Sequence, residues 1–422
     1  MRIAFLAYRG NMQSGGQGVY LHALTRELAA LGHEIDVFVG PPYPDPMPWA
    51  RVRRIRNGRY WGARFARQRG AFLPRPDPFQ IFRPLDFYEF AVTRFGFLPE
   101  PLAFSLRAAR GVVRQMRAGV RYDVVHDVQS LGYGLLWLRM LGLPVVSTIH
   151  HPLTVDRRSS LRRDRSFKEL KGTLTFYPVA MQGRVARRLD AILTSSEASA
   201  AEIVRGFGAR RERLHRVANG VRLPALHPSR PCPATRELLF VGRCGDPNKG
   251  LEYLLSALAL LPDDVVLRVL DAYPSGTPLA LQLRELGLER RVTFEGKVSS
   301  ERLEQAYHRA AVVVVPSLFE GFGLPAVEGL AAGTPVVATR AGALPEVLER
   351  IRAGRLVPPA DPAGLAKGIA AVLEDWPAEQ AAVSAARPRI EAAYGWPEIA
   401  RSTARVYSEV TQSLGEVARS VG

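Results

Sequence analysis

The chain has 422 residues, of which 47% are hydrophobic and 23% charged, the composition of an ordinary globular protein with enough apolar residues for two cores. Its longest apolar region, residues 131–149, is interrupted by Arg139 and Pro144, which excludes a membrane-spanning helix of ~20 apolar residues. The net charge of +17 is uneven, because residues 1–230 carry 37 Lys and Arg against 17 Asp and Glu, whereas residues 231–422 carry 20 against 23. This asymmetry predicts domains with different partners.

The first elements form a βαβ unit. A strand is expected at residues 3–8, a helix with apolar residues on one face after residue 18, and a second strand at residues 34–39. The turn between them carries Gly15 and Gly16 but lacks the G-x-G-x-x-G pattern of dinucleotide-binding proteins. The first apolar run is too short for a signal peptide, and the only cysteines, Cys232 and Cys244, indicate a reducing compartment such as the cytoplasm.

Residues 40–110 mix basic and aromatic side chains, and we expect them to form an insertion in the first domain. After a proline-rich loop, arginines such as Arg53 and Arg54 alternate with apolar and aromatic residues such as Trp61, and an aromatic stretch follows at residues 79–97. This mixture suits the interface of an anionic membrane, and it would also suit nucleic acid. A solvated basic face over a locally packed insertion would also explain it.

The alternation of strands and helices then resumes, with strands expected at residues 122–126, 144–150 and 191–195. The first two strands are expected to place His126 and His150 at their carboxyl ends, the edge at which ligands bind in open α/β sheets. A lone histidine at such a position can also be a hydrogen-bonded structural residue. A second cationic block at residues 156–171 includes Arg162 and Arg163 and follows His150 closely.

A proline-rich linker is expected at residues 222–236, before a second series of βα units. Lys249 is expected at the beginning of a helix, where the positive end of the helix dipole disfavours a cation unless an anion lies nearby. A diphosphate would supply that anion, and Arg243 could bind it with two parallel hydrogen bonds. Further strands are expected at residues 238–243, 265–270, 292–295, 311–315, 334–338 and 354–358, and a single helix at residues 396–421.

Residues 311–335 are the most informative stretch of the second half. A run of valines predicts a buried parallel strand, and a helix is expected at residues 326–332, with Pro325 at its first position. The loop between them contains Gly321 and Gly323, and such a loop directs backbone N–H groups and a helix N-terminus at one point, which suits an anion or a polyhydroxyl ligand. Glu320 lies on the loop and Glu328 on the helix, so both carboxylates can face the same ligand.

This stretch resembles the E-x7-E motif of retaining glycosyltransferases with the GT-B architecture, and in particular glycosyltransferase family 4. The resemblance extends over nearly the whole chain and is strongest from residue 238 to 360. It implies an α/β fold of two Rossmann-like domains whose parallel sheets face each other across a cleft. Residues 1–225 would form the acceptor-binding domain, residues 226–396 the sugar-nucleotide-binding domain, and residues 397–422 a helix that packs back on the N-terminal domain.

The resemblance also implies roles for individual residues. The first Glu of the motif and the backbone that follows it would hold the donor sugar, the second Glu the ribose, and the Arg–Lys pair the diphosphate, whereas Val298 would border the nucleobase. The residues expected to bind the donor are Gly15, Gly16, Arg243, Lys249, Val298, Glu320, Gly321, Phe322, Gly323, Leu324 and Glu328. The residues expected to be catalytic are Glu320, His150, Arg243 and Lys249. Asp271-Ala-Tyr-Pro replaces a glycine-rich strand end of the family, which leaves donor contacts there open.

The expected function is therefore transfer of a sugar, with retention, from a nucleotide-diphosphate sugar to a lipid or glycan acceptor. The departing diphosphate needs a metal ion or fixed positive charge, and because Arg243 and Lys249 supply that charge, we expect neither a metal nor another cofactor. We expect a cytoplasmic protein bound peripherally to the cytoplasmic face of an anionic membrane, and no nucleic acid partner. The residues expected to contact the acceptor or the membrane are Arg53, Arg54, Trp61, Arg162 and Arg163.

Two other functions fit the sequence. The chain could be a sugar-nucleotide epimerase of the same fold, which would act on the donor without an acceptor. It could also be a basic protein that binds nucleic acid or membrane and has no transferase activity, although such a protein would not need Arg243, Lys249, Glu320 and Glu328 together.

Overall fold

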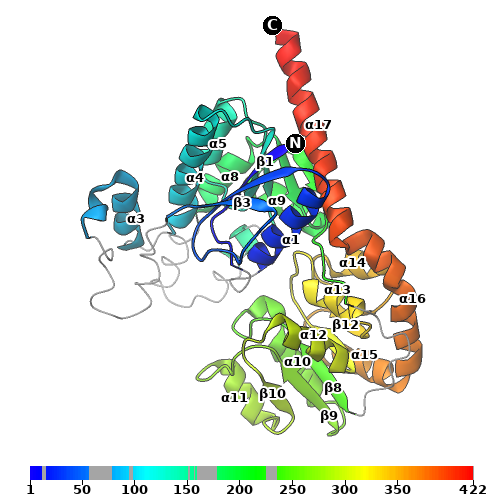
Figure 1. The fold of residues 1–422 in the computed structure, drawn as a ribbon. Coiled ribbons are helices and arrows are strands. Elements are labelled where there is room, and N and C mark those ends of the chain that lie inside the picture. Colours follow the sequence, from blue (N-terminus) through cyan, green and yellow to red (C-terminus); the bar gives the residue numbers. More distant parts are fainter. Residues whose placement is uncertain are drawn as a thin grey trace. The chain divides into compact units, whose positions relative to one another are not determined.

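The computed structural model describes residues 1–11, 16–56, 78–94, 98–150, 153–155, 157–158, 178–224 and 235–421. The chain divides into two compact units, Met1–Val217 together with Ile399–Gly422, and Ala218–Glu398. Each unit contains its own parallel sheet flanked by helices (Figure 1). The expected pair of Rossmann-like α/β halves is confirmed.

The first unit is built on a sheet with the strand order β3-β2-β1-β4-β5-β6-β7, in which every neighbouring pair is parallel. Its central strands are buried throughout, as expected for a parallel sheet covered on both faces. The strands are β1 (Arg2–Ala7), β2 (Glu34–Val39), β3 (Ala50–Arg54), β4 (Val124–Val128), β5 (Val145–Thr148), β6 (Ala191–Thr194) and β7 (Leu214–Arg216).

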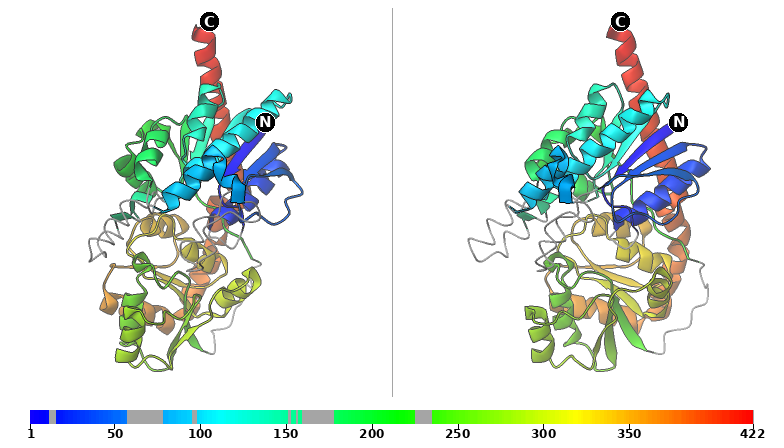
Figure 2. Two further views of the ribbon diagram at one scale, coloured as in Figure 1. Left: turned by 90° about the vertical axis from the view of Figure 1, so that its left-hand side faces the viewer. Right: turned by 60° about the vertical axis from the view of Figure 1, so that its left-hand side comes forward.

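All helices of the first unit except α17 lie between its strands in the sequence, and α4 packs along β1 and β2 (Figure 2). Local sequence explains several helix ends, since the Ser196 hydroxyl accepts a hydrogen bond from Ser199 N and Gly208 ends the same helix in a left-handed conformation. The helices are α1 (Gly16–Ala30), α3 (Pro84–Arg94), α4 (Glu100–Arg117), α5 (Gly134–Met140), α8 (Val179–Ala186), α9 (Glu197–Phe207) and α17 (Trp396–Val421), with short 3-10 turns η1 (Pro78–Phe82) and η2 (Arg211–Arg213).

Two features of the first unit differ from expectation. The residues around Arg53 were expected only as a basic segment, but they form edge strand β3, which pairs with β2. His126 was expected at the end of a strand but lies in the middle of β4, because the strand continues through Asp127 and Val128. The expectation that His126 lies at the ligand-binding edge was therefore wrong.

The second unit contains a sheet with the order β10-β9-β8-β11-β12-β13, again parallel throughout. Its strands are β8 (Arg236–Phe240), β9 (Val265–Val269), β10 (Val292–Phe294), β11 (Val312–Val315), β12 (Val336–Thr339) and β13 (Arg355–Val357). Its helices are α10 (Leu251–Leu258), α11 (Pro278–Glu285), α12 (Ser300–Arg309), α13 (Leu324–Ala331), α14 (Leu344–Ile351), α15 (Pro362–Glu374) and α16 (Trp376–Tyr394), and the 3-10 turn η3 spans Pro247–Lys249.

Every strand predicted in the second half is present with its ends within three residues of the prediction, and the predicted final helix matches α17. Among the described helices, none is both long and apolar enough to cross a membrane. Four of the residues expected to bind the donor, the acceptor or the membrane lie outside the described residues: Gly15, Trp61, Arg162 and Arg163.

Candidate functional site

In the second unit, two loops at the carboxyl ends of neighbouring strands are joined to each other. The loop after β8 contacts the loop after β11 through a hydrogen bond of 2.8 Å from Leu318 N to Asn248 O. Gly250 makes this approach possible, because a Cβ atom at this position would lie 2.1 Å from the Pro316 carbonyl oxygen. The two sequence motifs that resemble the donor site, residues 243–250 and 316–328, therefore meet in space.

Glu320 and Lys249 form the centre of this arrangement. Lys249 Nζ donates a 2.7 Å hydrogen bond to Glu320 Oε1, and the Ser317 hydroxyl donates to the same oxygen at 2.8 Å. The Glu320 side chain is 8% exposed and that of Lys249 25% exposed. The sequence argument required an anion beside Lys249 and assigned a diphosphate to that place. The structure supplies Glu320 instead, so the position of Lys249 does not by itself require a phosphate.

Arg243 has the opposite environment. Its side chain is 83% exposed, and its guanidinium lies 3.5 Å from Asp246 Oδ2. The backbone beside it is fixed, since Cys244 N donates a 2.7 Å hydrogen bond to Asp271 Oδ2. Asp271 belongs to the segment that departs from the family pattern, and here it braces the Arg243 loop. Burial, with Asp271 nearby, raises the pKa of the Cys244 thiol to about 12, so the thiol stays protonated at neutral pH.

Glu328 lies on α13 and is held by a residue that the sequence analysis did not identify. The Tyr307 hydroxyl, from α12, donates a 2.7 Å hydrogen bond to Glu328 Oε2. Burial raises the pKa of Glu328 to about 6, although the hydrogen bond from Tyr307 opposes that rise. Near neutral pH the carboxyl group is therefore an ionised acceptor close to its titration range.

The loop between Glu320 and Glu328 leads into α13 as expected. Gly323 directly precedes the helix with φ of 90°, a conformation that favours glycine, and Leu324 is the first helical residue. Gly321 lies on the loop and is half-buried. Phe322 is buried, and its ring packs edge-on against Tyr394 with 5.4 Å between the ring centroids, which anchors the loop to α16.

Val298 lies in the turn after β10 and is half-buried. This turn is tied to the neighbouring strand segment, because Gly296 N donates to Asp271 O at 3.0 Å. Arg268 of β9 is ion-paired with Glu295, and Arg302 of α12 lies 2.7 Å from the same carboxylate. The turn around Val298 is thus fixed by ion pairs between three elements.

In the first unit, His150 lies two residues beyond β5, at the carboxyl edge where the sequence placed it. Its backbone N donates a 2.9 Å hydrogen bond to Gln129 Oε1. Its ring packs edge-on against Tyr20 of α1, with 4.5 Å between the ring centroids. Gly16 is the first residue of that helix.

Asp127 organises the loop that reaches His150. Its buried carboxylate accepts hydrogen bonds from Ser130 N, Leu131 N and the Ser147 hydroxyl at 2.8–3.1 Å. Burial raises the pKa of Asp127 to about 6 even though these hydrogen bonds lower it. The bonds fold residues 128–131 into a tight turn, which places Gln129 against the backbone of His150.

His126 is a structural residue. It is fully buried, its Nδ1 shares a hydrogen bond with the Tyr407 hydroxyl of α17, and its Nε2 lies 2.7 Å from Thr148 Oγ1. Burial lowers the pKa of His126 to about 3, so the ring is neutral at physiological pH. This imidazole connects α17 to the first sheet.

The basic residues of β3 are also engaged within the first unit. Arg53 Nε donates a 3.1 Å hydrogen bond to Asp36 Oδ1, and Asp36 is fully buried. The Arg54 guanidinium lies over the Tyr43 ring, 5.1 Å from its centroid. Within the part of the chain that the structure describes, no three His, Cys, Asp or Glu side chains gather as metal ligands would.

The comparisons with known proteins now identify the family. The sequence profile described as Glycosyltransferase Family 4 matches residues 14–223, and that of Glycosyl transferases group 1 matches residues 235–375. A relative from Mycolicibacterium hassiacum, named "MMP alpha-(1->4)-mannosyltransferase", is 38% identical over 97% of this chain and 98% of its own length. The chain belongs to glycosyltransferase family 4.

Solved structures agree on the architecture of this glycosyltransferase. Sucrose-phosphate synthase from Thermosynechococcus elongatus superposes with a TM-score of 0.69 at 23% identity, covering 98% of this chain and 99% of that protein. HepE from Anabaena, solved in complex with UDP-glucose, gives a TM-score of 0.63 at 20% identity with full coverage of both chains. The protein has the GT-B fold and is a glycosyltransferase that moves a sugar to an acceptor.

Several residues of this glycosyltransferase were not identified from the sequence. Tyr307 and Tyr20 carry no motif and become visible only through their contacts with Glu328 and His150, whereas Ser317 belongs to the Val-Pro-Ser strand end before the E-x7-E stretch but was given no role there. Asp127 had a weak signal, because an Asp followed three residues later by Ser at a strand end is typical of a turn capped by its own side chain.

Proposed function

We propose that this glycosyltransferase is a retaining mannosyltransferase that transfers mannose from a nucleotide-diphosphate mannose to a glycan acceptor and forms an α-linkage. The choice of sugar and linkage rests on the mannosyltransferase that shares 38% identity over nearly the whole chain. Nucleotide-activated mannose is α-linked to its diphosphate, so an α-linked product means retention at the anomeric carbon.

The Lys249–Glu320 pair is the observation that carries the proposed mechanism. An ammonium group has three donors, and one of them points to Glu320, so the others can bind the departing diphosphate while the pair remains intact. Lys249 and Ser317 both donate to Oε1 of Glu320, and we propose Oε2 as the acceptor for a hydroxyl of the donor sugar. Glu328 would accept hydrogen bonds from the ribose.

Fixed cations would stabilise the leaving group. Arg243 is exposed on a braced loop and can close on the diphosphate with a bidentate hydrogen bond, and Lys249 would add the second positive charge. We propose that this charge replaces a metal ion in the reaction. His150, fixed by Tyr20 and Gln129, would orient the sugar or the acceptor.

A ligand-binding screen tests the donor and the site together. GDP-mannose, UDP-glucose and other nucleotide sugars are added to the purified protein with EDTA present, and the melting temperature is measured. A ligand that binds only the folded state increases the free energy of unfolding by mass action, by about 2.7 kcal/mol at a hundredfold excess over Kd, and the melting temperature rises as a result. We expect one mannose nucleotide to do so, and the shift to vanish in Lys249→Ala and Glu328→Ala.

The control for this screen is Lys367→Ala, which removes a lysine of α15 in the same unit. It should keep the full shift. Failure of every nucleotide sugar to stabilise well-folded wild-type protein would overturn the donor site. Conversion of the donor to another sugar nucleotide without an acceptor would favour an epimerase instead.

We also propose that the protein binds anionic membranes through its first unit. Three phenylalanines of η1 and α3, Phe79, Phe82 and Phe87, are 57–79% exposed, and exposed Arg83 lies among them. Apolar rings beside a cation suit the interface of an anionic bilayer. Sedimentation with vesicles checks this, and equal binding to neutral and anionic vesicles would contradict it.

A further inference from the structure

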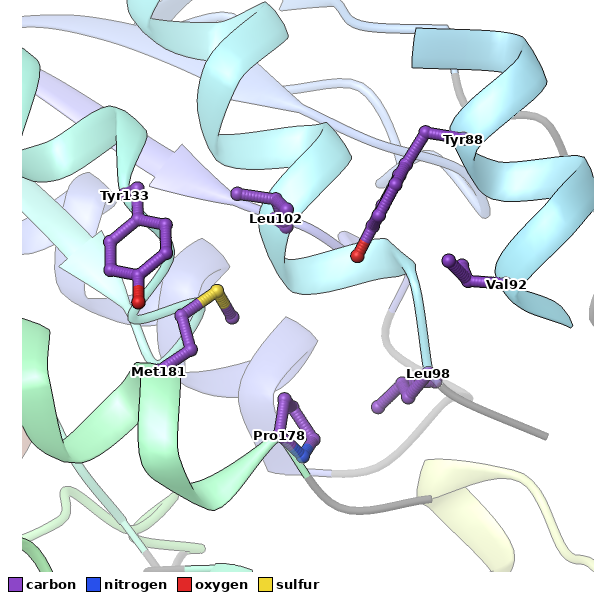
Figure 3. Close-up of a pocket in the computed structure, with 7 residues that line it drawn as sticks. All are labelled: Tyr88, Val92, Leu98, Leu102, Tyr133, Pro178 and Met181. Atoms are coloured by element: carbon purple, nitrogen blue, oxygen red, sulfur yellow. The ribbon is translucent and has the colours of Figure 1, made fainter. Parts of the chain in front are cut away.

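A pocket of about 320 Å³ lies in the first unit, and none of the residues that line it was assigned above to donor or acceptor (Figure 3). The side chains that line it come from helices α3, α4 and α8 and from the residues that precede α4, α5 and α8, and Figure 3 shows them facing a common space. They are Tyr88, Val92, Leu98, Leu102, Tyr133, Pro178 and Met181. The lining is apolar apart from two tyrosine hydroxyls, and the volume lies at the small end of ligand pockets, which span about 300–1,000 Å³.

The topology places this pocket at the ligand-binding edge of the sheet. Leu102 lies in the first turn of α4, Tyr133 directly precedes α5, and Pro178 directly precedes α8, which has Met181 in its first turn. In a parallel α/β sheet, the helix that follows a strand begins at the strand's carboxyl end. The pocket therefore lies on the same edge of the first sheet as His150, which follows β5.

The remaining wall comes from α3, which the structure fixes firmly. Arg107 of α4 donates hydrogen bonds to both carboxylate oxygens of Glu89 at 2.8 and 2.9 Å, and a third to Asp86 at 2.9 Å. The Glu89 side chain is 1% exposed. A buried bidentate ion pair of this kind holds α3 against α4, and with it Tyr88, next to Glu89, and Val92, one helical turn further on.

The chemistry of the pocket favours an apolar group with a polar end. Val, Leu, Pro and Met side chains offer no hydrogen bonds to sugar hydroxyls, and burying unpaired hydroxyls there would cost free energy. The polar groups are the Tyr88 hydroxyl, which points into the pocket in Figure 3, and the Tyr133 hydroxyl, which accepts a 3.2 Å hydrogen bond from Arg184. A chain that is apolar along its length and polar where it joins a sugar fits this lining.

We propose that this pocket binds a short aliphatic chain attached to the acceptor, at its reducing end, while the sugar lies toward His150. The inference rests on the proposed transfer to a glycan acceptor and adds an aglycone subsite to it. The apolar side chains of Met181, Val92 and Leu102 set the preference for an alkyl group, and each methylene buried against them should lower the dissociation constant about fourfold.

Methyl NMR tests the pocket without the reaction. The protein is labelled with 13C-methyl methionine and titrated with octyl α-mannoside below its micelle concentration, with methyl α-mannoside and with n-octanol. Met181 lines the pocket, whereas Met140, at the end of α5, is 84% exposed and serves as an internal control. We expect octyl α-mannoside to shift the Met181 signal with saturation and methyl α-mannoside to leave it unchanged.

Three other outcomes would contradict the proposal in whole or in part. Equal shifts at Met140 and Met181 would mean non-specific detergent binding only and would overturn the proposal. A shift with n-octanol as strong as with octyl α-mannoside would overturn the part that places a sugar at the mouth of the pocket. No shift at Met181 with any alkyl compound would overturn the pocket itself.

Kinetics then separate the pocket from the proposed function. With the donor identified, octyl α-mannoside should have a KM at least about tenfold lower than methyl α-mannoside, because a few methylenes are buried. Met181→Gln should raise the KM of the octyl acceptor about fivefold or more and leave the methyl acceptor unchanged, and Met140→Gln should change neither. Transfer to methyl α-mannoside with no preference for the octyl compound would overturn the pocket while the transferase function stands.

Discussion

Glu320 and Glu328 are separated by seven residues, and their surroundings give them different properties. Glu320 is paired with Lys249, so its negative charge is balanced in the folded protein. Glu328 faces the neutral hydroxyl of Tyr307, and burial raises its pKa to about 6. The spacing of the two acids in the sequence therefore predicts where they lie, but the residues that surround each carboxyl group in the folded protein decide what it contacts and, for Glu328, raise its pKa by burial.

The pKa of Glu328 predicts how donor binding depends on pH. If the ribose donates hydrogen bonds to this carboxylate, protonation below about pH 6 removes the acceptor, and the donor's Kd should rise up to about tenfold per pH unit. The diphosphate diester of a nucleotide sugar does not titrate in this range. Calorimetric titration between about pH 5 and about pH 8 measures the effect.

Two variants identify the group that titrates in this experiment. Glu328→Gln should weaken binding and flatten the profile. Tyr307→Phe removes the hydrogen bond that holds the pKa down, so the midpoint should move to higher pH. A wild-type slope that persists in Glu328→Gln would show that another group is responsible.

At the scale of single elements, α3 has two faces with different roles. One face carries Glu89, Tyr88 and Val92 toward α4 and the apolar pocket. Arg107 of α4 holds this face in place through its hydrogen bonds to Glu89. The other carries Phe87, which is exposed. Exposed aromatic rings cost free energy in water unless something covers them, and a bilayer interface is a suitable cover.

The vesicle experiment can therefore be sharpened at η1. Phe79→Ser and Phe82→Ser each remove an exposed ring, and we expect each to reduce sedimentation with anionic vesicles several-fold without lowering the melting temperature. Leu260→Ser is the matched control, since this residue of the second unit is 63% exposed and should leave binding unchanged. Equal losses in all three variants would mean that general surface hydrophobicity, and not this element, attracts the membrane.

At the scale of the whole molecule, one chain of hydrogen bonds joins the last helix to the first. Tyr407 of α17 contacts His126, His126 contacts Thr148, and the Tyr20 hydroxyl of α1 lies 2.9 Å from Thr148 Oγ1. Tyr20 in turn packs against His150. Residues more than 280 positions apart in the sequence therefore share one buried polar network in the first unit.

This network predicts acid sensitivity. Burial lowers the pKa of His126 to about 3 in the folded protein, below its usual 6.5. The unfolded chain then binds a proton between these pH values that the folded chain does not, so His126 should lower the free energy of unfolding by about 1.4 kcal/mol per pH unit below about 6.5. Its contribution is fully present above that pH and is lost on acidification.

Urea unfolding of wild type and His126→Gln at about pH 7 and about pH 5 measures this contribution. Asp127, whose pKa is raised, acts in the opposite direction, but it is present in both proteins and cancels in the comparison. The wild type should lose more stability on acidification than the variant. Parallel pH profiles for wild type and His126→Gln would contradict the prediction.

Tyr407→Phe should destabilise the protein by about 1–3 kcal/mol at neutral pH, because the variant leaves a buried nitrogen of the His126 ring without the hydroxyl that it contacts.

The sequence by itself determined the family, the two α/β units and the position of nearly every strand in the second half. Hydrophobic periodicity and turn residues are local, and the loop of Glu320 is defined by glycines and a proline within a few residues. The tertiary structure alone decided which side chains act as partners, since Lys249 meets Glu320, Tyr307 meets Glu328 and Tyr407 meets His126 across long stretches of chain. It also decided that His126 is structural and that helices far apart in the sequence enclose an apolar pocket. The burial of one side chain and the meeting of distant helices both depend on packing between elements, and neither leaves a periodic pattern in the sequence.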